Sequence, residues 1–308
     1  MNKVAFIFPG QGSQYTGMGQ DLYNEDEHFK AVIESASHVS GYNLEKIIYS
    51  DDDRLNETRY TQIAMLAVEA AILDKLSRDG IRCDIAAGLS LGEYGALLAS
   101  ESISKEDAFF LVTRRGALMQ DAYPTGGAMC AVLGMEADKI SEVIGGVEGL
   151  VSIANYNCPG QIVITGEHNA VEDAIIALKE NGARKCIPLK VSGPFHSKLL
   201  ESASQELMEE LNKVKFSDPK IPYISNVGAQ YVTKAEDIPG LLKMQICSSV
   251  MWQQSVEKMI HDGVDTFVEI GPKKSLCGFL RKIDRSVVAY NIEDAASYAK
   301  TYEALKNS

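Results

Sequence analysis

Apolar positions form a short continuous run at the start of the chain and follow a helical spacing further along it. Residues 4–8 are all apolar and lead into the polar, glycine-rich sequence Pro-Gly-Gln-Gly-Ser-Gln, which predicts a buried strand followed by a loop. Over residues 60–78 apolar side chains recur at every third or fourth position, which predicts a helix. Residues 85–87 then predict a second buried strand.

The middle of the chain has a different order of elements. Its sequence predicts strand, helix, strand, strand, helix and strand in turn, which is the order of a ferredoxin-like domain. Segments rich in glycine and proline bound it, at Pro124-Thr125-Gly126-Gly127 and at Ser192-Gly193-Pro194. We therefore expect an inserted ferredoxin-like α+β subdomain of residues 126–192. Its predicted strands are 128–133, 150–154, 161–165 and 184–189, and its predicted helices are 137–144 and 171–181.

Strands alternate with helices on both sides of this insert. That alternation predicts a mostly parallel sheet covered by helices. We expect residues 1–125 and 193–308 to form one large α/β-hydrolase-like domain. The other predicted helices are 94–100, about 104–120 with Ser104 as N-cap, 197–213 and 254–261, and the other predicted strands are 221–225 and 266–270.

Charge and composition argue against several classes of function. The chain has 42 acidic residues against 30 Lys and Arg, a formal net charge of −12, so nucleic acid is a poor candidate partner. No apolar stretch approaches the roughly 20 residues that span a bilayer. The six cysteines are scattered without a Cys-x-x-Cys pair, which argues against a metal or redox site. With no export signal in the first residues, we expect a cytoplasmic protein, and a monomer by default.

The sequence Gly88-Leu89-Ser90-Leu91-Gly92 stands between a predicted strand and a predicted helix. This arrangement fits a nucleophile elbow, a sharp turn that exposes the serine hydroxyl and leaves no room for side chains at the flanking glycines. The following helix favours negative charge at its amino end, and the backbone N–H of Leu91 would be one oxyanion donor. The alternative interpretation is a glycine-rich turn with a capping serine.

A serine nucleophile needs a base, and His196 is the candidate among five histidines. It lies in a tight loop between a predicted strand and a predicted helix, far from Ser90 in the sequence, so only the fold can unite them. The alternative is a loop histidine whose ring is satisfied by the backbone. The other four lie in polar or turn sequence typical of a protein surface: His28, His38, His168 and His261.

Several separated segments resemble one known family, the malonyl-CoA:acyl carrier protein transacylases of fatty-acid synthesis and the related polyketide acyltransferase domains. The likeness covers nearly the whole chain in the family's order. The matching segments are Phe8-Pro9-Gly10-Gln11-Gly12-Ser13-Gln14, Gly88-Leu89-Ser90-Leu91-Gly92-Glu93-Tyr94, Arg115-Gly116 with Met119, Asn155-Tyr156-Asn157-Cys158-Pro159-Gly160-Gln161, Gly193-Pro194-Phe195-His196-Ser197 and Val268-Glu269-Ile270-Gly271-Pro272.

The resemblance implies a reaction and a set of roles. The family transfers malonyl from malonyl-CoA to the phosphopantetheine thiol of an acyl carrier protein through a malonyl-serine intermediate, and it uses no cofactor. Ser90 would be the nucleophile and His196 the base. Gln11 would supply a second backbone N–H beside that of Leu91 in the oxyanion hole. Gln245 aligns with the residue whose main-chain carbonyl orients the histidine.

The resemblance also implies that Arg115 binds the free carboxylate of malonyl, which a guanidinium meets with two parallel hydrogen bonds. Arg114 is the rival, but adjacent helical residues point about 100° apart, so only one should face the pocket. Two positions bear on acyl selectivity. Many members have histidine where Leu89 stands, and Phe195 resembles the malonyl-selective members.

Other functions are open on the sequence alone. A serine esterase or thioesterase could use the same elbow, a non-catalytic protein could keep the fold for carrier docking, and the pathway could be polyketide rather than fatty-acid synthesis. Because carrier proteins are typically acidic, docking requires a local basic face on this acidic chain. Two basic groups are candidates: Arg184, Lys185, Lys190 and Lys198 beside the base, and Lys273, Lys274, Arg281 and Lys282.

Overall fold

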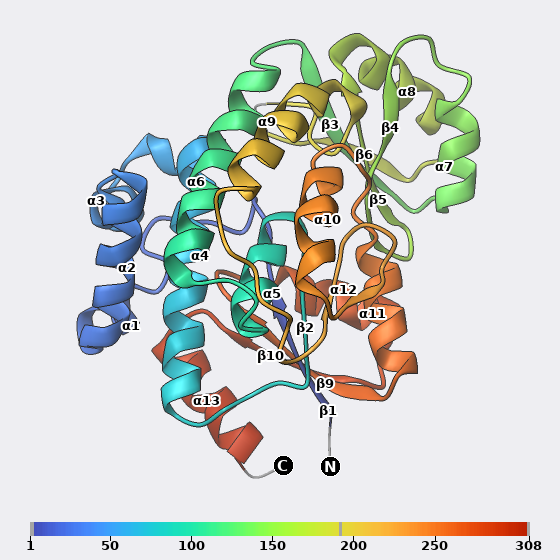
Figure 1. Ribbon diagram of the computed structural model, residues 1–308. Helices are drawn as coiled ribbons and strands as arrows, with labels where there is room; N and C mark the ends of the chain where they lie inside the picture. Colours follow the sequence, from blue (N-terminus) through green and yellow to red (C-terminus); the bar gives the residue numbers. More distant parts are fainter. Residues whose placement is uncertain (1–2, 191–192, 307–308) are drawn as a thin grey trace.

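A six-stranded sheet forms the centre of the larger part of the molecule (Figure 1). The computed structural model describes residues 3–190 and 193–306, so Ser192, at the predicted exit from the insert, lies outside the described residues. The strands run parallel except at one edge, where β8 is antiparallel to β7. In sheet order they are β10 (Val288–Ile292), β9 (Val264–Ile270), β1 (Lys3–Phe8), β2 (Ile85–Gly88), β7 (Tyr223–Ile224) and β8 (Tyr231–Val232).

Helices cover both faces of this sheet, and the first strand shows the consequence. β1 is apolar at almost every position, as expected for a strand buried on both faces. Phe6 and Phe8 lie in one apolar core, with residues of the long helix α4 (Thr58–Arg78). Ala5 lies in a second core with residues of α11 (Trp252–His261). Successive side chains of a strand point to opposite faces, so this short strand contributes to the apolar cores on both faces of the sheet.

The predicted helices are present, with adjusted ends. Ser104 caps α6 (Lys105–Ala122) by accepting a hydrogen bond from the backbone of Asp107. The predicted helix 197–213 begins instead with a 3-10 turn, and regular helix starts only at α9 (Glu201–Leu211). The remaining helices of the large part are α1 (Gln20–Glu25), α2 (Glu27–Ser40), α3 (Leu44–Tyr49), α5 (Glu93–Ala99), α10 (Ile238–Gln245), α12 (Ser275–Ile283) and α13 (Ala295–Lys306), with 3-10 turns at Asp53–Asn56, Ser90–Gly92, Lys198–Leu200 and Ala235–Asp237.

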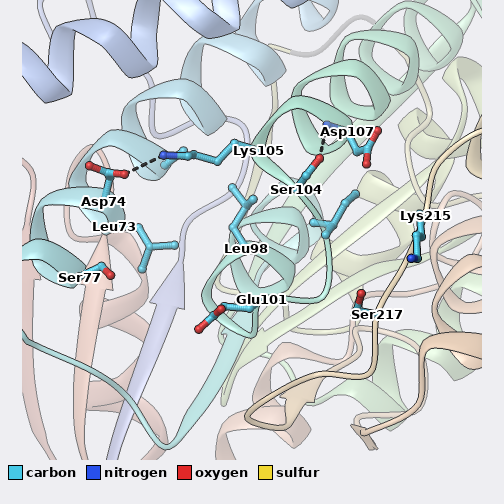
Figure 2. A pocket seen from close by; sticks show the side chains of 12 residues that line it. Leu73, Asp74, Ser77, Leu98, Glu101, Ser104, Lys105, Asp107, Lys215 and Ser217 are labelled. Carbon is cyan, nitrogen blue, oxygen red and sulfur yellow. Dashed lines mark hydrogen bonds and ion pairs between the residues drawn. The ribbon is translucent and has the colours of Figure 1, made fainter.

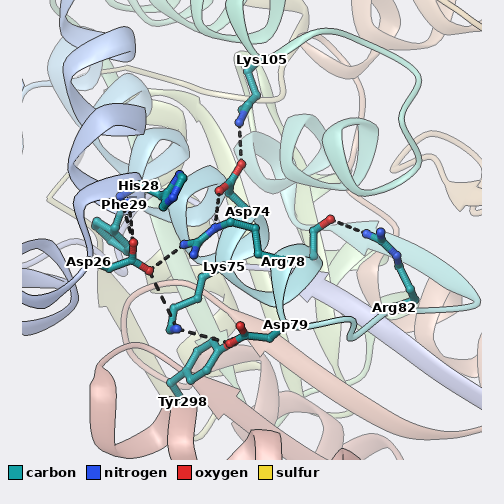
Figure 3. A network of polar contacts seen from close by, with 11 residues as sticks. Asp26, His28, Phe29, Asp74, Lys75, Arg78, Asp79, Arg82, Lys105 and Tyr298 are labelled. Carbon is teal, nitrogen blue, oxygen red and sulfur yellow. Dashed lines mark hydrogen bonds and ion pairs between the residues drawn. The ribbon is translucent and has the colours of Figure 1, made fainter.

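Ion pairs tie the amino-terminal helices to α4 (Figure 3). Arg78, near the end of α4, contacts Asp74 one turn earlier and also Asp26, the N-cap of α2. Asp74 in turn contacts Lys105 at the start of α6, at 2.7 Å. Isolated surface ion pairs contribute little to stability, whereas several charges in one network contribute more. This network therefore adds to the apolar packing that holds α2 and α6 against α4.

The middle of the chain forms a second, antiparallel sheet. Its strand order is β4-β5-β3-β6, which is the order of a ferredoxin-like sheet built from strand, helix, strand, strand, helix and strand. This sheet and its two helices enclose an apolar core of their own. The elements are β3 (Gly127–Leu133), α7 (Ala137–Ile144), β4 (Val151–Cys158), β5 (Gln161–Glu167), α8 (His168–Glu180) and β6 (Lys185–Pro188). The predicted fold class is therefore confirmed, whereas the domain boundaries stay a prediction.

Backbone hydrogen bonds join this second sheet to the large part. The N–H of Val250, just before α11, donates to the carbonyl of Ala154, and the N–H of Tyr156 donates to the carbonyl of Val250. Asn155, between the two bonded residues of β4, shares a cavity lining with Gln11, which follows β1, and Leu89, which follows β2. Within the described ranges, no helix combines the length and apolar character needed to cross a membrane.

Candidate active site

Ser90 lies in a sharp turn between β2 and α5. Its φ of 56° is in the left-handed region, which non-glycine residues seldom adopt and which is common at functional sites. A Cβ on Gly88 would lie 1.9 Å from the carbonyl carbon of Gly92, and a Cβ on Gly92 would lie 2.1 Å from the carbonyl oxygen of Phe8. Both glycines are therefore required by close backbone approach, as the sequence predicted for an elbow.

The hydroxyl of Ser90 faces the ring of His196. Ser90 Oγ lies 2.7 Å from His196 Nε2, although the two residues are 106 positions apart in the sequence. On the other side of the ring, Nδ1 lies 2.9 Å from the main-chain carbonyl of Gln245. Since a carbonyl only accepts, Nδ1 carries the proton and Nε2 is left as an acceptor for the serine hydroxyl. The Nδ1–H group of His196 is thus hydrogen-bonded to the backbone, while its Nε2 can still accept a proton as the predicted base would.

Burial keeps the ring of His196 neutral. Desolvation, and to a smaller degree the charge of Arg115, lowers the pKa of His196 from 6.5 to about 4, because both disfavour a second positive charge. Its side chain is 4% exposed. At neutral pH the imidazole is therefore unprotonated and able to accept a proton from Ser90.

The guanidinium of Arg115 lies beside the same hydroxyl. Its Nη2 donates to Ser90 Oγ at 3.1 Å and to Gln245 Oε1 at 2.8 Å, and its Nη1 donates to Gln62 Oε1 at 2.7 Å. Arg115 is 1% exposed, whereas the side chain of Arg114 is 46% exposed and pairs with Glu210 of α9. Only one of the two adjacent arginines faces the site, and it is Arg115.

A small cavity of about 90 Å³ lies in front of the serine. Every predicted site residue except Gln245 lines it, and Gln245 stands behind the histidine. Its size suits a short acyl group. The lining side chains are Gln11, Gln62, Leu89, Ser90, Leu91, Arg115, Met119, Met129, Asn155, Leu189, Phe195 and His196. The fold therefore brings the six predicted residues together, while the role of each stays a prediction.

Comparison with known families and proteins shows which family the chain belongs to. It matches the acyl transferase domain over residues 5–301. The malonyl CoA-acyl carrier protein transacylase of Bacillus subtilis is 43% identical over 311 residues, covering 99% of this chain and 98% of that protein. The chain belongs to this transacylase family. The predicted family and the predicted enzyme class, an acyltransferase, are confirmed.

Solved structures of transacylases agree over the whole fold. The enzyme from Streptococcus pneumoniae is 46% identical, with a TM-score of 0.94 over 98% of this chain and 100% of that chain. A malonyl-transacylase solved in complex with a type II polyketide acyl-carrier protein is 37% identical, with a TM-score of 0.96 over 99% of this chain and 100% of that chain. The site of this transacylase chain therefore lies on the family's own scaffold.

Asn226 is a buried residue of the transacylase site that sequence reasoning missed. Its Oδ1 accepts the backbone N–H of Ser90 at 2.6 Å, and its Nδ2 donates to the carbonyl of Gly88 at 2.6 Å. The amide thus bridges both sides of the strained turn and holds it in place. The available signal was its position two residues after a short buried strand, at the carboxyl edge of the sheet.

A larger cavity of about 490 Å³ lies away from the transacylase site, between α4, α5 and the start of α6 (Figure 2). Its floor is apolar, with Leu73 and Leu98, and its rim carries Lys105 and Lys215. No histidine stands among the described residues that line it. Likewise, the described part of the chain holds no cluster of three or more His, Cys, Asp or Glu side chains suited to a metal ion. The predicted nucleophile and base, Ser90 and His196, line the smaller cavity.

Proposed function

We propose that this chain transfers malonyl from malonyl-CoA to the phosphopantetheine thiol of an acyl carrier protein, through a malonyl group held on Ser90. One observation carries the proposal: a hydroxyl paired with a neutral imidazole lies 3.1 Å from a buried guanidinium in one small cavity. The names of the relatives support the same reaction.

In the first half-reaction, Ser90 Oγ attacks the thioester carbonyl carbon while His196 Nε2 takes its proton. The tetrahedral oxyanion is stabilised by the backbone N–H groups of Gln11 and Leu91, which line the cavity. The intermediate then collapses, the C–S bond breaks, and His196 returns the proton to the departing coenzyme A thiolate. The product of this step is a malonyl ester of Ser90.

In the second half-reaction the same groups act in reverse. His196 takes the proton of the carrier's thiol, the sulfur attacks the ester carbonyl, and the proton passes to Ser90 as the oxygen leaves. The acyl carbon keeps its oxidation state in both steps. In each step one proton passes from the attacking group to His196 and then to the leaving group. The proposed reaction therefore runs without a cofactor.

Arg115 gives the site its preference for malonyl. A free carboxylate enters a closed cavity only if its charge is paired, because desolvation of an unpaired charge is costly. Arg115 is buried and lies within hydrogen-bond distance of the nucleophile, so it stands at the end of a short acyl group on Ser90. Phe195 and Leu89, which also line the cavity, limit the room for substituents.

The basic side chains at the mouth of this cavity are the proposed docking face for the carrier. Lys190 follows the cavity-lining Leu189, and Lys198 follows the His196 loop, and both are exposed. Lys273 donates to the carbonyl of Gly12, next to the cavity-lining Gln11. Arg184, Lys185 and Lys274 extend the two groups and are exposed as well. The relative solved with its carrier protein supports a carrier as partner. One chain supplies every proposed catalytic and docking residue, so a monomer is sufficient for the reaction.

The proposed role is supply of malonyl-carrier to fatty-acid synthesis. The relative solved with a polyketide carrier makes polyketide synthesis the second candidate. Incubation with malonyl-CoA and either a fatty-acid or a polyketide holo-carrier, followed by mass analysis of the carrier, tests both. We expect rapid formation of malonyl-carrier from the fatty-acid partner. Rapid release of free malonate without malonyl-carrier would instead identify a thioesterase.

A further inference from the structure

The buried charge of Arg115 has no carboxylate in contact with it among the described residues. Its hydrogen-bond partners are the neutral oxygens of Gln62, Ser90 and Gln245. A buried cation is costly unless hydrogen bonds and a counter-charge offset its desolvation. The arrangement leaves the guanidinium free for a substrate carboxylate, but it requires that the neutral partners be held firmly in place.

Glu93, the first residue of α5, holds one of these partners. It is 0% exposed, and its Oε2 accepts a hydrogen bond from Gln245 Nε2 at 2.6 Å and from the backbone N–H of Asn226 at 3.1 Å. The other end of the same amide, Gln245 Oε1, accepts from Arg115 at 2.8 Å. Gln245 therefore connects a buried carboxyl group to the buried guanidinium.

We propose that Glu93 is a positioning residue, which fixes the side-chain amide of Gln245 and thereby aims the guanidinium of Arg115 at the malonyl carboxylate. The inference rests on the proposed function, because it assigns a device for substrate selection to the same site. No direct glutamate–arginine pair competes with the substrate, since the amide separates the two groups.

The geometry explains why the amide adopts one orientation. Gln245 Nε2 also donates to the main-chain carbonyl of Ser90 at 3.0 Å and, at 3.5 Å, to Asn226 Oδ1, so its two hydrogens face oxygen acceptors only. A flipped amide would place Oε1 against the carboxyl group of Glu93 and turn its N–H groups toward the guanidinium. Both contacts would be repulsive, and Arg115 would lose an acceptor.

The role of Glu93 depends on an oxygen acceptor and not on its charge. Burial raises the pKa of Glu93 to about 7, although the N–H donors of Asn226 and Gln245 and the charge of Arg115 lower it. An amide oxygen at the Oε2 position would accept the same two hydrogen bonds. Because Asn226 donates a backbone N–H there, a glutamine at position 93 would be held with its oxygen toward Gln245.

The test compares Glu93→Leu, which removes the acceptor, with Glu93→Gln, which keeps it. The rate of acyl-enzyme formation is measured with malonyl-CoA and with acetyl-CoA, and kcat/KM for malonyl is divided by that for acetyl. We expect Glu93→Leu to lower this ratio about tenfold or more, and Glu93→Gln to keep it within about threefold of the wild type. Glu69→Leu is the matched control, since Glu69 is also 0% exposed in a helix but neither carboxylate oxygen has a partner among the described residues; its ratio should not change.

An equal loss of malonyl and acetyl transfer in Glu93→Leu, or a changed ratio in Glu69→Leu, would overturn the inference. Either result would show that Glu93 acts only through packing. A tenfold loss of the ratio in Glu93→Gln, on the order of a full hydrogen bond to a charged group, would assign the effect to charge and also overturn it. If circular dichroism shows that Glu93→Leu is unfolded, Gln245→Met decides: a wild-type ratio refutes the link through the amide, and a fall of about tenfold supports it. A wild-type protein that forms no malonyl-enzyme would instead refute the proposed function.

Discussion

Replacement of Arg115 by alanine separates recognition of the malonyl carboxylate from the chemistry of acyl transfer. Arg115 is 1% exposed, its guanidinium lies 3.1 Å from Ser90 Oγ, and no other Arg or Lys stands among the described residues of the cavity lining. An acetyl group has no free carboxylate, so it makes no use of this charge. We therefore expect Arg115→Ala to lose malonyl transfer far more than acetyl transfer.

The magnitude follows from the burial of Arg115. Loss of one partner from a buried, hydrogen-bonded charge pair costs about 2–5 kcal/mol. Since each 1.4 kcal/mol is a factor of ten, kcat/KM for malonyl-CoA should fall about 30- to 4,000-fold. Acetyl transfer loses the hydrogen bond from the charged Nη2 to Ser90 Oγ, which is worth about 1.5 kcal/mol and predicts a loss of about tenfold. Malonyl transfer loses this bond and the paired carboxylate as well.

The assay is quenched-flow mass analysis of the acyl-enzyme with each thioester. Arg114→Ala is the control, because Arg114 precedes Arg115 in the same helix but its side chain pairs with Glu210 and does not line the cavity. Its kcat/KM values should stay close to those of the wild type. Arg115→Lys keeps the charge but loses the planar fork, so it should recover only part of the malonyl rate. Equal losses for malonyl and acetyl in Arg115→Ala would show that another group reads the carboxylate.

Three further predictions concern the base, the turn and the docking face. Because the pKa of His196 is lowered to about 4, the acid limb of the pH profile of kcat/KM should lie near pH 4; a limb near 6.5 would contradict the burial argument. The stability that the neutral ring contributes should persist above pH 6.5 and be lost as the pH falls toward 4. Gly92→Ala should cost about 3 kcal/mol or more of unfolding free energy in urea, because its Cβ meets a carbonyl, whereas Gly240→Ala, in an open helical position, should cost nothing. Lys190→Glu with Lys198→Glu should raise KM for the carrier but not for malonyl-CoA, and equal effects on both would reject this docking face.

Features confined to a few neighbouring residues could be predicted from the sequence. The turn around Ser90 is one of them, because the strand, the glycines and the helix all lie within one short segment. The steric reason for the glycines can therefore be read from neighbouring residues. The helix period likewise showed that only one of Arg114 and Arg115 could face the cavity, but not which one. That choice came from resemblance to a family, and it agrees with the burial of Arg115 in the structure.

Features that depend on distant contacts could not be predicted. Asn226 lies 136 residues from Ser90 and supports the turn only because β7 pairs with β2. The predicted strand 221–225 is present as the shorter β7, whereas β8, which has two residues and shows no alternating pattern, and β10 went unpredicted. Glu93 belongs to a recognised segment, yet its contact with Gln245 spans 152 residues. A sequence pattern can point to a residue as a candidate, whereas the order of strands in the sheet decides which distant residues come into contact.

In the proposed reaction the hydroxyl of Ser90 carries the malonyl group between the two thiols. Intact-mass analysis after brief mixing with malonyl-CoA, followed by peptide mapping, tests it directly. We expect one malonyl adduct on the peptide that contains Ser90, no adduct in Ser90→Ala, and loss of the adduct when holo-carrier is added. Malonyl transfer that continues at the wild-type rate in Ser90→Ala, or an adduct on another residue, would contradict it.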